Sequence, residues 1–115
     1  MVSKLKIYTT MAVKWDWDKI ETEESPIKRD RLWGYFASFE MAERAVLENW
    51  GDNFDEAGYY NGAVIEEVTE GYFEWDWERR WFYRHRPDYK DGDAHLLERM
   101  PEPRYYKNVV AITLG

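Results

Sequence analysis

The sequence predicts an α+β fold in which an antiparallel sheet of about five strands carries one amphipathic helix packed on one face. Three observations lead to this prediction. Short segments rich in β-branched and aromatic residues alternate with turn-forming glycine, proline and aspartate. One segment, 39–50, has its apolar residues at helical spacing. The chain of 115 residues fits a single domain, 1–115, which is large enough to bury a core.

The N-terminal part is expected to hold two strands joined by a long connection. Residues 4–13 alternate between apolar and polar side chains, as a half-buried strand does. Residues 14–26, KWDWDKIETEESP, show no sustained period, so we expect a long loop or an irregular extension of the strand, with one or two tryptophans packed inward. Residues 31–37, RLWGYFA, form a short aromatic strand in which Gly34 indicates a bulge or close packing.

The helix is expected to begin after Ser38, which has the right side chain for an N-cap, and Glu40 lies in its positive first turn. The apolar stripe consists of Phe39, Ala42, Val46 and Trp50, and the side chains expected to face outward are Glu43, Arg44, Glu48 and Asn49. Gly51 is predicted to end the helix as a left-handed cap.

The C-terminal half is predicted to add strands, which span residues 59–68, 79–86, 94–100 and 109–115. Gly62 is a possible bulge in the first of them. Asp91 and Gly92 supply a turn that pairs the second and third strands as a hairpin.

Composition excludes several classes of site. The chain has no cysteine, which rules out disulfides, thiolate zinc sites and thiol nucleophiles. It has neither the apolar run of a signal peptide nor the roughly 20 apolar residues of a membrane span, so we expect a soluble protein without a membrane partner. The expected location is the cytoplasm, that of the host cell if a phage encodes the protein. A net charge of −7 argues against direct binding of nucleic acid.

No catalytic motif is present. The three serines lie outside any nucleophile elbow, and the glycines are too dispersed for a phosphate loop, so we expect no enzyme and no cofactor. Adjacent Glu66 and Glu67 would point to opposite faces of a strand. We expect each side chain to be solvated and to lie across from an arginine on the neighbouring strand. His85 and His95 flank an aspartate-rich turn, which could bind a metal but is more simply a turn former; no metal is expected. A small hydrolase or isomerase remains a third functional class.

The stretch EWDWERRWFYRHR, residues 74–86, combines many arginines with many aromatic rings. On a strand over 79–86, one face would hold Trp81 and Tyr83 and enter the core, and the other would present three arginines around Phe82. Arginine forks bind phosphate, and rings stack on bases. The residues predicted to bind a ligand are Trp75, Trp77, Arg80, Phe82, Arg84, Arg86, Trp33 and Tyr35. The alternative is a scaffold strand whose arginines neutralise nearby acids.

Several segments resemble a family of small, aromatic-rich proteins from bacteria, phages and mobile elements. The likeness covers about residues 31–115 and rests on LWGYFASFEMAERAVLEN, YYNGAVIEEVTEGYF, WFY, the Asp-Gly turn and KNVV. The resemblance implies a context of accessory or phage-borne genes, in which small acidic proteins often block host defences. It implies no functional residues.

Two binding functions follow from these features. The first is a non-enzymatic protein that sequesters a small nucleotide-derived ligand from a host effector. The alternative is an acidic inhibitor of a host defence protein, in which the segment 40–78, with twelve acids and one base, imitates nucleic acid. We also expect a homo-oligomer, because an exposed final strand and surplus surface aromatics would be partly buried between subunits.

Overall fold

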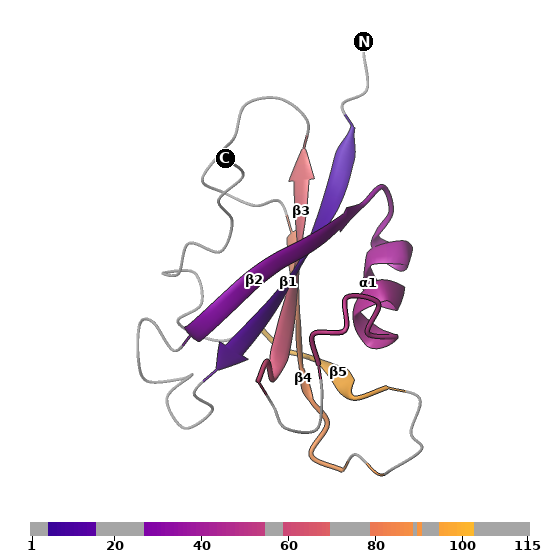
Figure 1. Cartoon of the computed structure of the whole chain (residues 1–115). Helices are drawn as coiled ribbons and strands as arrows, with labels where there is room; N and C mark the ends of the chain where they lie inside the picture. Colours follow the sequence, from indigo (N-terminus) through magenta and orange to yellow (C-terminus); the bar gives the residue numbers. More distant parts are fainter. Residues whose placement is uncertain are drawn as a thin grey trace.

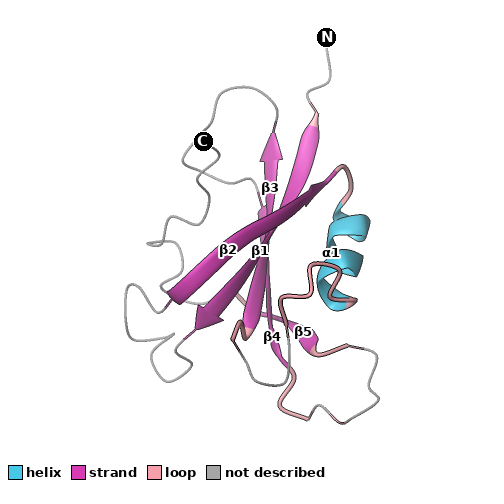
Figure 2. Ribbon diagram, viewed as in Figure 1, coloured by secondary structure: helices cyan, strands magenta, loops and turns pink. Residues whose placement is uncertain are grey.

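The computed structural model of the chain describes residues 5–15, 27–54, 59–69, 79–88, 90 and 95–102. These residues form a five-stranded antiparallel sheet with one helix packed against it, which confirms the predicted fold class (Figures 1 and 2). The elements are β1 (Lys6–Trp15), β2 (Ile27–Phe36), α1 (Phe39–Leu47), β3 (Gly62–Thr69), β4 (Arg79–His85) and β5 (Leu97–Met100). Within the sheet the strand order is β2-β1-β3-β4-β5. The predicted strand at 109–115 lies outside the described residues.

The first hairpin is longer than the sequence predicted. β1 continues to Trp15, which fits the predicted extension of the first strand and not a loop from residue 14 onward. β2 begins at Ile27, four residues before the predicted strand at 31–37. Trp15 extends the buried alternation of Met11 and Val13, and it is only 1% exposed. The start of β2 was missed because Arg29, Asp30 and Arg31 are exposed and show no apolar period. Exposed charges are common on a strand at the edge of a sheet, and β2 lies at the edge of the described sheet.

Two glycines fit their strands for different reasons. Beside Gly34 the register of β1 and β2 shifts by one residue, which confirms the predicted bulge. Gly62 was predicted as a possible bulge, but β3 pairs without a register shift with both of its neighbours. Gly62 is instead needed for close packing, because an added Cβ would lie 2.6 Å from Cδ1 of Trp15 and nearer still to Nε1.

The helix begins as predicted but ends earlier. The Ser38 hydroxyl accepts a hydrogen bond from the Met41 amide at 3.2 Å. At the other end the left-handed residue is Asn49, with φ of 57°, and not Gly51. The Asn49 side chain explains this turn, because its Oδ1 accepts from two amides, those of Asn53 (3.0 Å) and Phe54 (3.1 Å).

Two side chains depart from the predicted pattern of the helix. Trp50 leaves the apolar stripe and is 47% exposed. Glu43, expected to face outward, instead faces the sheet. Its Oε2 accepts a 2.5 Å hydrogen bond from the Tyr83 hydroxyl and forms an ion pair with Arg99. Glu43 therefore ties α1 to β4 and β5.

Both faces of the sheet are buried at its centre. The α1 side holds a cluster of buried residues, which are Ala12, Ala42, Val46, Phe54, Ala63, Ile65, Tyr83 and Leu97. The opposite side holds a second buried cluster, which consists of Met11, Val13, Trp15, Val64 and Phe82. No helix among the described residues has the length and apolar character required to cross a membrane.

Candidate functional site

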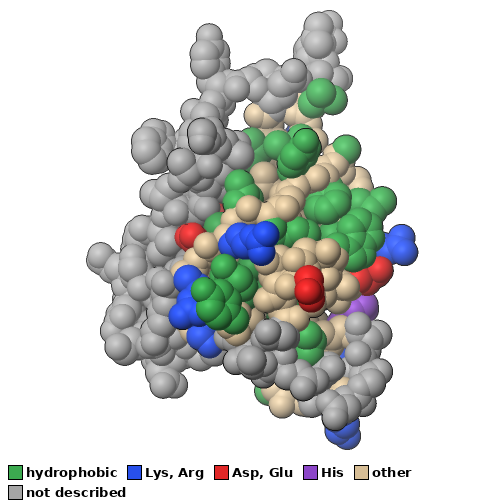
Figure 3. All heavy atoms as spheres, in the orientation of Figure 1, with side chains coloured by type: hydrophobic (Ala, Val, Ile, Leu, Met, Phe, Trp, Pro, Cys, Tyr) green, Lys and Arg blue, Asp and Glu red, His purple; other side chains and the backbone are tan. Residues whose placement is uncertain are grey.

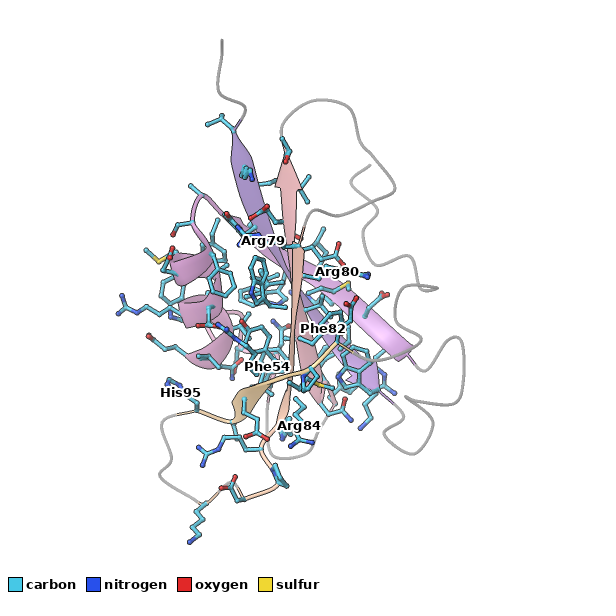
Figure 4. The ribbon with its side chains drawn as sticks, turned by 180° about the vertical axis from the view of Figure 1, so that it is seen from behind. Phe54, Arg79, Arg80, Phe82, Arg84 and His95 are labelled. Carbon is cyan, nitrogen blue, oxygen red and sulfur yellow. The ribbon has the colours of Figure 1, made fainter. Side chains whose placement is uncertain are left out.

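The arginine-rich strand β4 alternates as predicted. Trp81 and Tyr83 belong to the cluster on the α1 side of the sheet. Phe82 belongs to the buried cluster on the other side, and Figure 4 shows it pointing away from α1. Phe82 is only 1% exposed, and its ring lies 6.5 Å from that of Trp15. The expectation that this face would present an open phenyl ring between arginines was therefore wrong, because the sheet buries both of its faces.

The arginines of this stretch form ion pairs with carboxylates of the same chain. On the Phe82 side, Arg80 pairs with Glu102 at 2.6 Å and Arg84 with Glu98 at 2.9 Å. Arg86 lies 3.4 Å from Asp88. These contacts match the scaffold alternative, in which the strand neutralises nearby acids. An anionic ligand at β4 would have to displace these carboxylates first.

On the α1 side of β4, Arg79 belongs to a network around Glu67, which is 1% exposed. Glu67 accepts hydrogen bonds from Arg79 (2.6 Å), from the Tyr8 hydroxyl (2.9 Å) and from Lys6 (3.3 Å). The hydrogen bond to Glu67, followed by burial, raises the pKa of Tyr8. This buried carboxylate is thus fully engaged in structure.

Of the acids in the segment 40–78 that the structure describes, Glu40, Glu48 and Asp52 are exposed, but others are not. Glu66 and Glu67 lie on opposite faces of β3, as predicted, but both are 1% exposed, so the expectation of solvated side chains was wrong. Glu43 faces the sheet, and Glu48 forms an ion pair with Arg44 at 2.7 Å. Imitation of nucleic acid by this segment stays a prediction.

Trp33 and Tyr35, the two predicted site residues on β2, lie far from β4. β1 and β3 separate the two strands, which corresponds to about 14 Å across the sheet at about 4.8 Å per strand. Both residues instead line an apolar groove of about 360 Å³. The predicted site residues therefore do not form one group, and Trp75 and Trp77 lie outside the described residues.

A different arginine–aromatic cluster lies at the start of β2. The Arg29 guanidinium carbon lies 4.1 Å from the centre of the Tyr59 ring, and both side chains are exposed. Arg29 is opposite Lys14 in the β1–β2 register, and Arg31 is on the same face, opposite Ala12. Among the described residues, no carboxylate forms an ion pair with either Arg29 or Arg31.

Two buried hydrogen-bond donors lie close to this cluster. Arg31 donates to Asn53 Oδ1 at 3.0 Å. Asn53 is 6% exposed, and its Nδ2 has no hydrogen-bond partner in the described part of the chain; the same is true of the buried Nε1 of Trp33. These two side chains flank Gly51, where an added Cβ would lie 2.7 Å from the Trp33 ring.

We call Arg29, Arg31, Asn53 and Tyr59 the β2 patch. Figure 3 shows lysine and arginine side chains gathered beside hydrophobic ones at the N-terminal end of β2. The patch combines guanidinium groups with an exposed ring, which together suit an anion that carries a ring.

Sequence reasoning missed the β2 patch because three separate segments build it. The KRDR run at 28–31 carried a signal, since alternating arginines share one face of a strand. Tyr59 and Asn53 could not be assigned to that face from the sequence, because no local pattern connects them with β2.

The histidines do not form a metal site with other described residues, since no group of three potential ligands comes together within the described ranges. His95 lies with Nδ1 2.9 Å from the carbonyl oxygen of Leu47, at the end of α1. Comparison of the chain with protein-family models, with curated proteins and with solved structures finds no match. The family resemblance therefore stays a prediction.

Proposed function

We propose that this chain is a non-enzymatic binding protein that captures a small nucleotide-like anion at the β2 patch. The proposal keeps the ligand class predicted from the sequence and moves its site from β4 to β2. The protein deprived of the ligand would be a host defence effector, in keeping with the family resemblance.

The observation that carries the proposal is the contrast between the two sets of arginines. Arg80 and Arg84 of β4 are neutralised by glutamates of the chain itself. Arg29 instead stacks on the exposed ring of Tyr59 and forms no ion pair with a described carboxylate. An arginine already ordered by a ring loses less side-chain freedom when it binds an anion.

The chemistry of the patch suggests how such a ligand would bind. The guanidinium groups of Arg29 and Arg31 would each take phosphate oxygens through paired N–H donors. A base would stack on Tyr59, which contributes about 1–3 kcal/mol in comparable sites. Cyclic oligonucleotides and ADP-ribose derivatives carry both groups and are the ligands to test first.

Isothermal titration against these two ligand classes, and against ATP as a common nucleotide, tests the proposal. We expect micromolar binding to at least one ligand. Arg29→Gln and Tyr59→Leu should each weaken it about tenfold or more, which corresponds to about 1.4 kcal/mol. The matched control is Arg84→Gln, which should leave affinity unchanged because that arginine is paired with Glu98.

Two results would contradict the proposal. If none of the ligands binds, nucleotide capture is wrong. If a ligand binds and the affinity falls with Arg84→Gln but not with Arg29→Gln, the site lies on β4, where the sequence placed it.

A further inference from the structure

A second feature of the β2 patch is the way in which Arg31 is held. Its Nη1 donates a hydrogen bond to Oδ1 of Asn53 at 3.0 Å. This partner is a neutral amide, whereas Arg80 and Arg84 of β4 contact carboxylates. Among the described residues no carboxylate forms an ion pair with Arg31, although the chain has 23 acidic residues for 16 lysines and arginines. Arg31 is therefore held in place without loss of its charge.

Asn53 is itself fixed by the turn that follows α1. It is 6% exposed, and its main-chain amide donates to Oδ1 of Asn49 at 3.0 Å. Nδ2 of Asn49 donates to the carbonyl oxygen of Phe54 at 2.7 Å, and Phe54 lies in the core. Asn49 and Asp52 have φ of 57° and 50°, a left-handed conformation that is uncommon outside glycine. Such a conformation persists only where the surrounding contacts determine it, so this turn presents Asn53 to Arg31 in a defined position.

The hydrogen bond to Asn53 occupies only part of the guanidinium group of Arg31. An arginine has five N–H donors in a planar fork, and Arg31 is exposed, so further donors remain for a ligand. Arg29 lies on the same face of β2 and is ordered in a different way, by the ring of Tyr59. Their Cα atoms are about 6.6 Å apart, at about 3.3 Å per strand residue. The patch thus offers two guanidinium groups that are both ordered before a ligand arrives, which lowers the cost of binding.

We propose that Asn53 is a positioning residue of the β2 patch, which holds Arg31 as a second phosphate-binding arm beside Arg29, so that the patch takes a ligand with two phosphate groups. This inference rests on the proposed function and narrows its ligand class to compounds such as nucleoside diphosphates and ADP-ribose. Two guanidinium groups without a described carboxylate partner match two phosphate charges, whereas a single phosphate would leave one of them without a counter-charge. A carboxylate in the place of Asn53 would pair with Arg31 and remove that arm.

Isothermal titration of the full chain with inorganic pyrophosphate and with orthophosphate tests this inference. The wild-type chain should bind pyrophosphate about tenfold or more tightly than orthophosphate, and Arg31→Gln should reduce this preference. Asn53→Ala releases Arg31 and should weaken pyrophosphate binding about threefold or more. Asn53→Asp should weaken it about tenfold or more, because the new carboxylate neutralises Arg31. In an Arg31→Gln background, Asn53→Ala should have no further effect, because Asn53 acts through Arg31.

Urea unfolding of the same variants separates positioning from a purely structural role. Asn53→Asp keeps the acceptor for Arg31, and the donor that it loses, Nδ2, has no hydrogen-bond partner in the described part of the chain. Asn53→Asp should therefore be at least as stable as Asn53→Ala and yet bind pyrophosphate more weakly. If Asn53 only supported the fold, affinity would follow stability and Asn53→Ala would be the weaker binder.

Ser38→Asp is the matched control for the added charge. Ser38 lies beyond the C-terminal end of β2, whereas the patch lies at its N-terminal end, and the N-cap position that Ser38 occupies also accepts aspartate. This variant should bind pyrophosphate within about twofold of the wild type.

Three results would overturn the inference: pyrophosphate that does not bind at millimolar concentration, an affinity of Asn53→Asp equal to or above that of Asn53→Ala, and a loss from Asn53→Ala that is unchanged in the Arg31→Gln background. Pyrophosphate has no ring, so this experiment is separate from the nucleotide titrations. If pyrophosphate shows the expected order of affinities and no nucleotide binds, the proposed function fails and the phosphate-binding arm stands. If a nucleotide binds with an affinity that the Asn53 variants do not change, the inference fails and the proposed function stands.

Discussion

Replacement of Gly62 by alanine probes its close contact with Trp15. Gly62 is opposite Val13 on one side and Arg84 on the other, so its backbone cannot easily move. The added Cβ would lie 2.6 Å from Cδ1 of Trp15, whereas carbon atoms pack best at about 3.5–4.0 Å. Since Trp15 is 1% exposed, the overlap has no escape into solvent.

The expected loss of stability lies between two limits. Overpacking of a core costs about 1–3 kcal/mol when neighbours can adjust. Expulsion of the Trp15 ring would approach the cost of its removal, about 3–5 kcal/mol. We therefore expect Gly62→Ala to lower the free energy of unfolding by about 2–4 kcal/mol.

Urea unfolding followed by far-ultraviolet circular dichroism measures this loss. Gly34→Ala is the matched control, since its Cβ would first meet the rotatable hydroxyl of Thr10, at 2.9 Å. That variant should change stability by less than about 1 kcal/mol, because alanine also restricts the unfolded chain. In a Trp15→Leu background, Gly62→Ala should cost less than it does alone, because the clash is gone. Equal costs for the two glycine variants, or a Gly62→Ala chain as stable as the wild type, would refute the packing argument.

Three further predictions concern hydrogen bonds and charges. Burial, followed by the hydrogen bond to Glu43, raises the pKa of Tyr83, so the contribution of this hydroxyl to stability is complete below about pH 10 and is lost as the pH rises further. Tyr83→Phe should therefore show a shallower alkaline decline in the free energy of unfolding in urea, by up to about 1.4 kcal/mol per pH unit. The buried Asn61 side chain accepts a hydrogen bond from the main-chain amide of Trp15 and donates one to its carbonyl oxygen. Asn61→Ala should therefore lower the free energy of unfolding in urea by about 1–3 kcal/mol, and Asn61→Asp, which retains the acceptor but not the donor, should not restore full stability. Arg84→Gln removes a half-exposed ion pair and should shift the unfolding free energy by no more than about 1 kcal/mol; a larger loss would show that β4 depends on its ion pairs for stability.

The fold class could be predicted because local patterns encode it. Ser38 marks the start of the helix, and the period of residues 79–86 correctly assigned Trp81 and Phe82 to opposite faces. The end of the helix could not be predicted, because it depends on hydrogen bonds that Asn49 Oδ1 accepts from the amides of Asn53 and Phe54, four and five residues later. Gly51 was predicted for that left-handed position because glycine adopts it most readily. Gly51 instead allows close packing against Trp33 and Asn53.

The candidate site was harder to predict than the fold. Strand geometry predicted which face of the sheet each β4 arginine lies on, but it could not predict which carboxylates neutralise them. Arg80 and Arg84 pair with Glu102 and Glu98, which are 22 and 14 residues away, so the pairing depends on how β5 and its flanking segment return along β4. The contact of Arg29 with Tyr59 likewise joins segments that no local period connects.

The attachment of α1 has a consequence for the order of folding. A helix of nine residues is too short to persist alone in water, where about 12–15 residues are marginal. Its anchors arrive late in the chain, because Glu43 meets Tyr83 and Arg99 across separations of 40 and 56 residues. A nascent or truncated chain that ends before β5 would therefore carry a frayed helix and an uncovered sheet face, and the amide protons of α1 would gain protection from exchange only once the far edge of the sheet has closed.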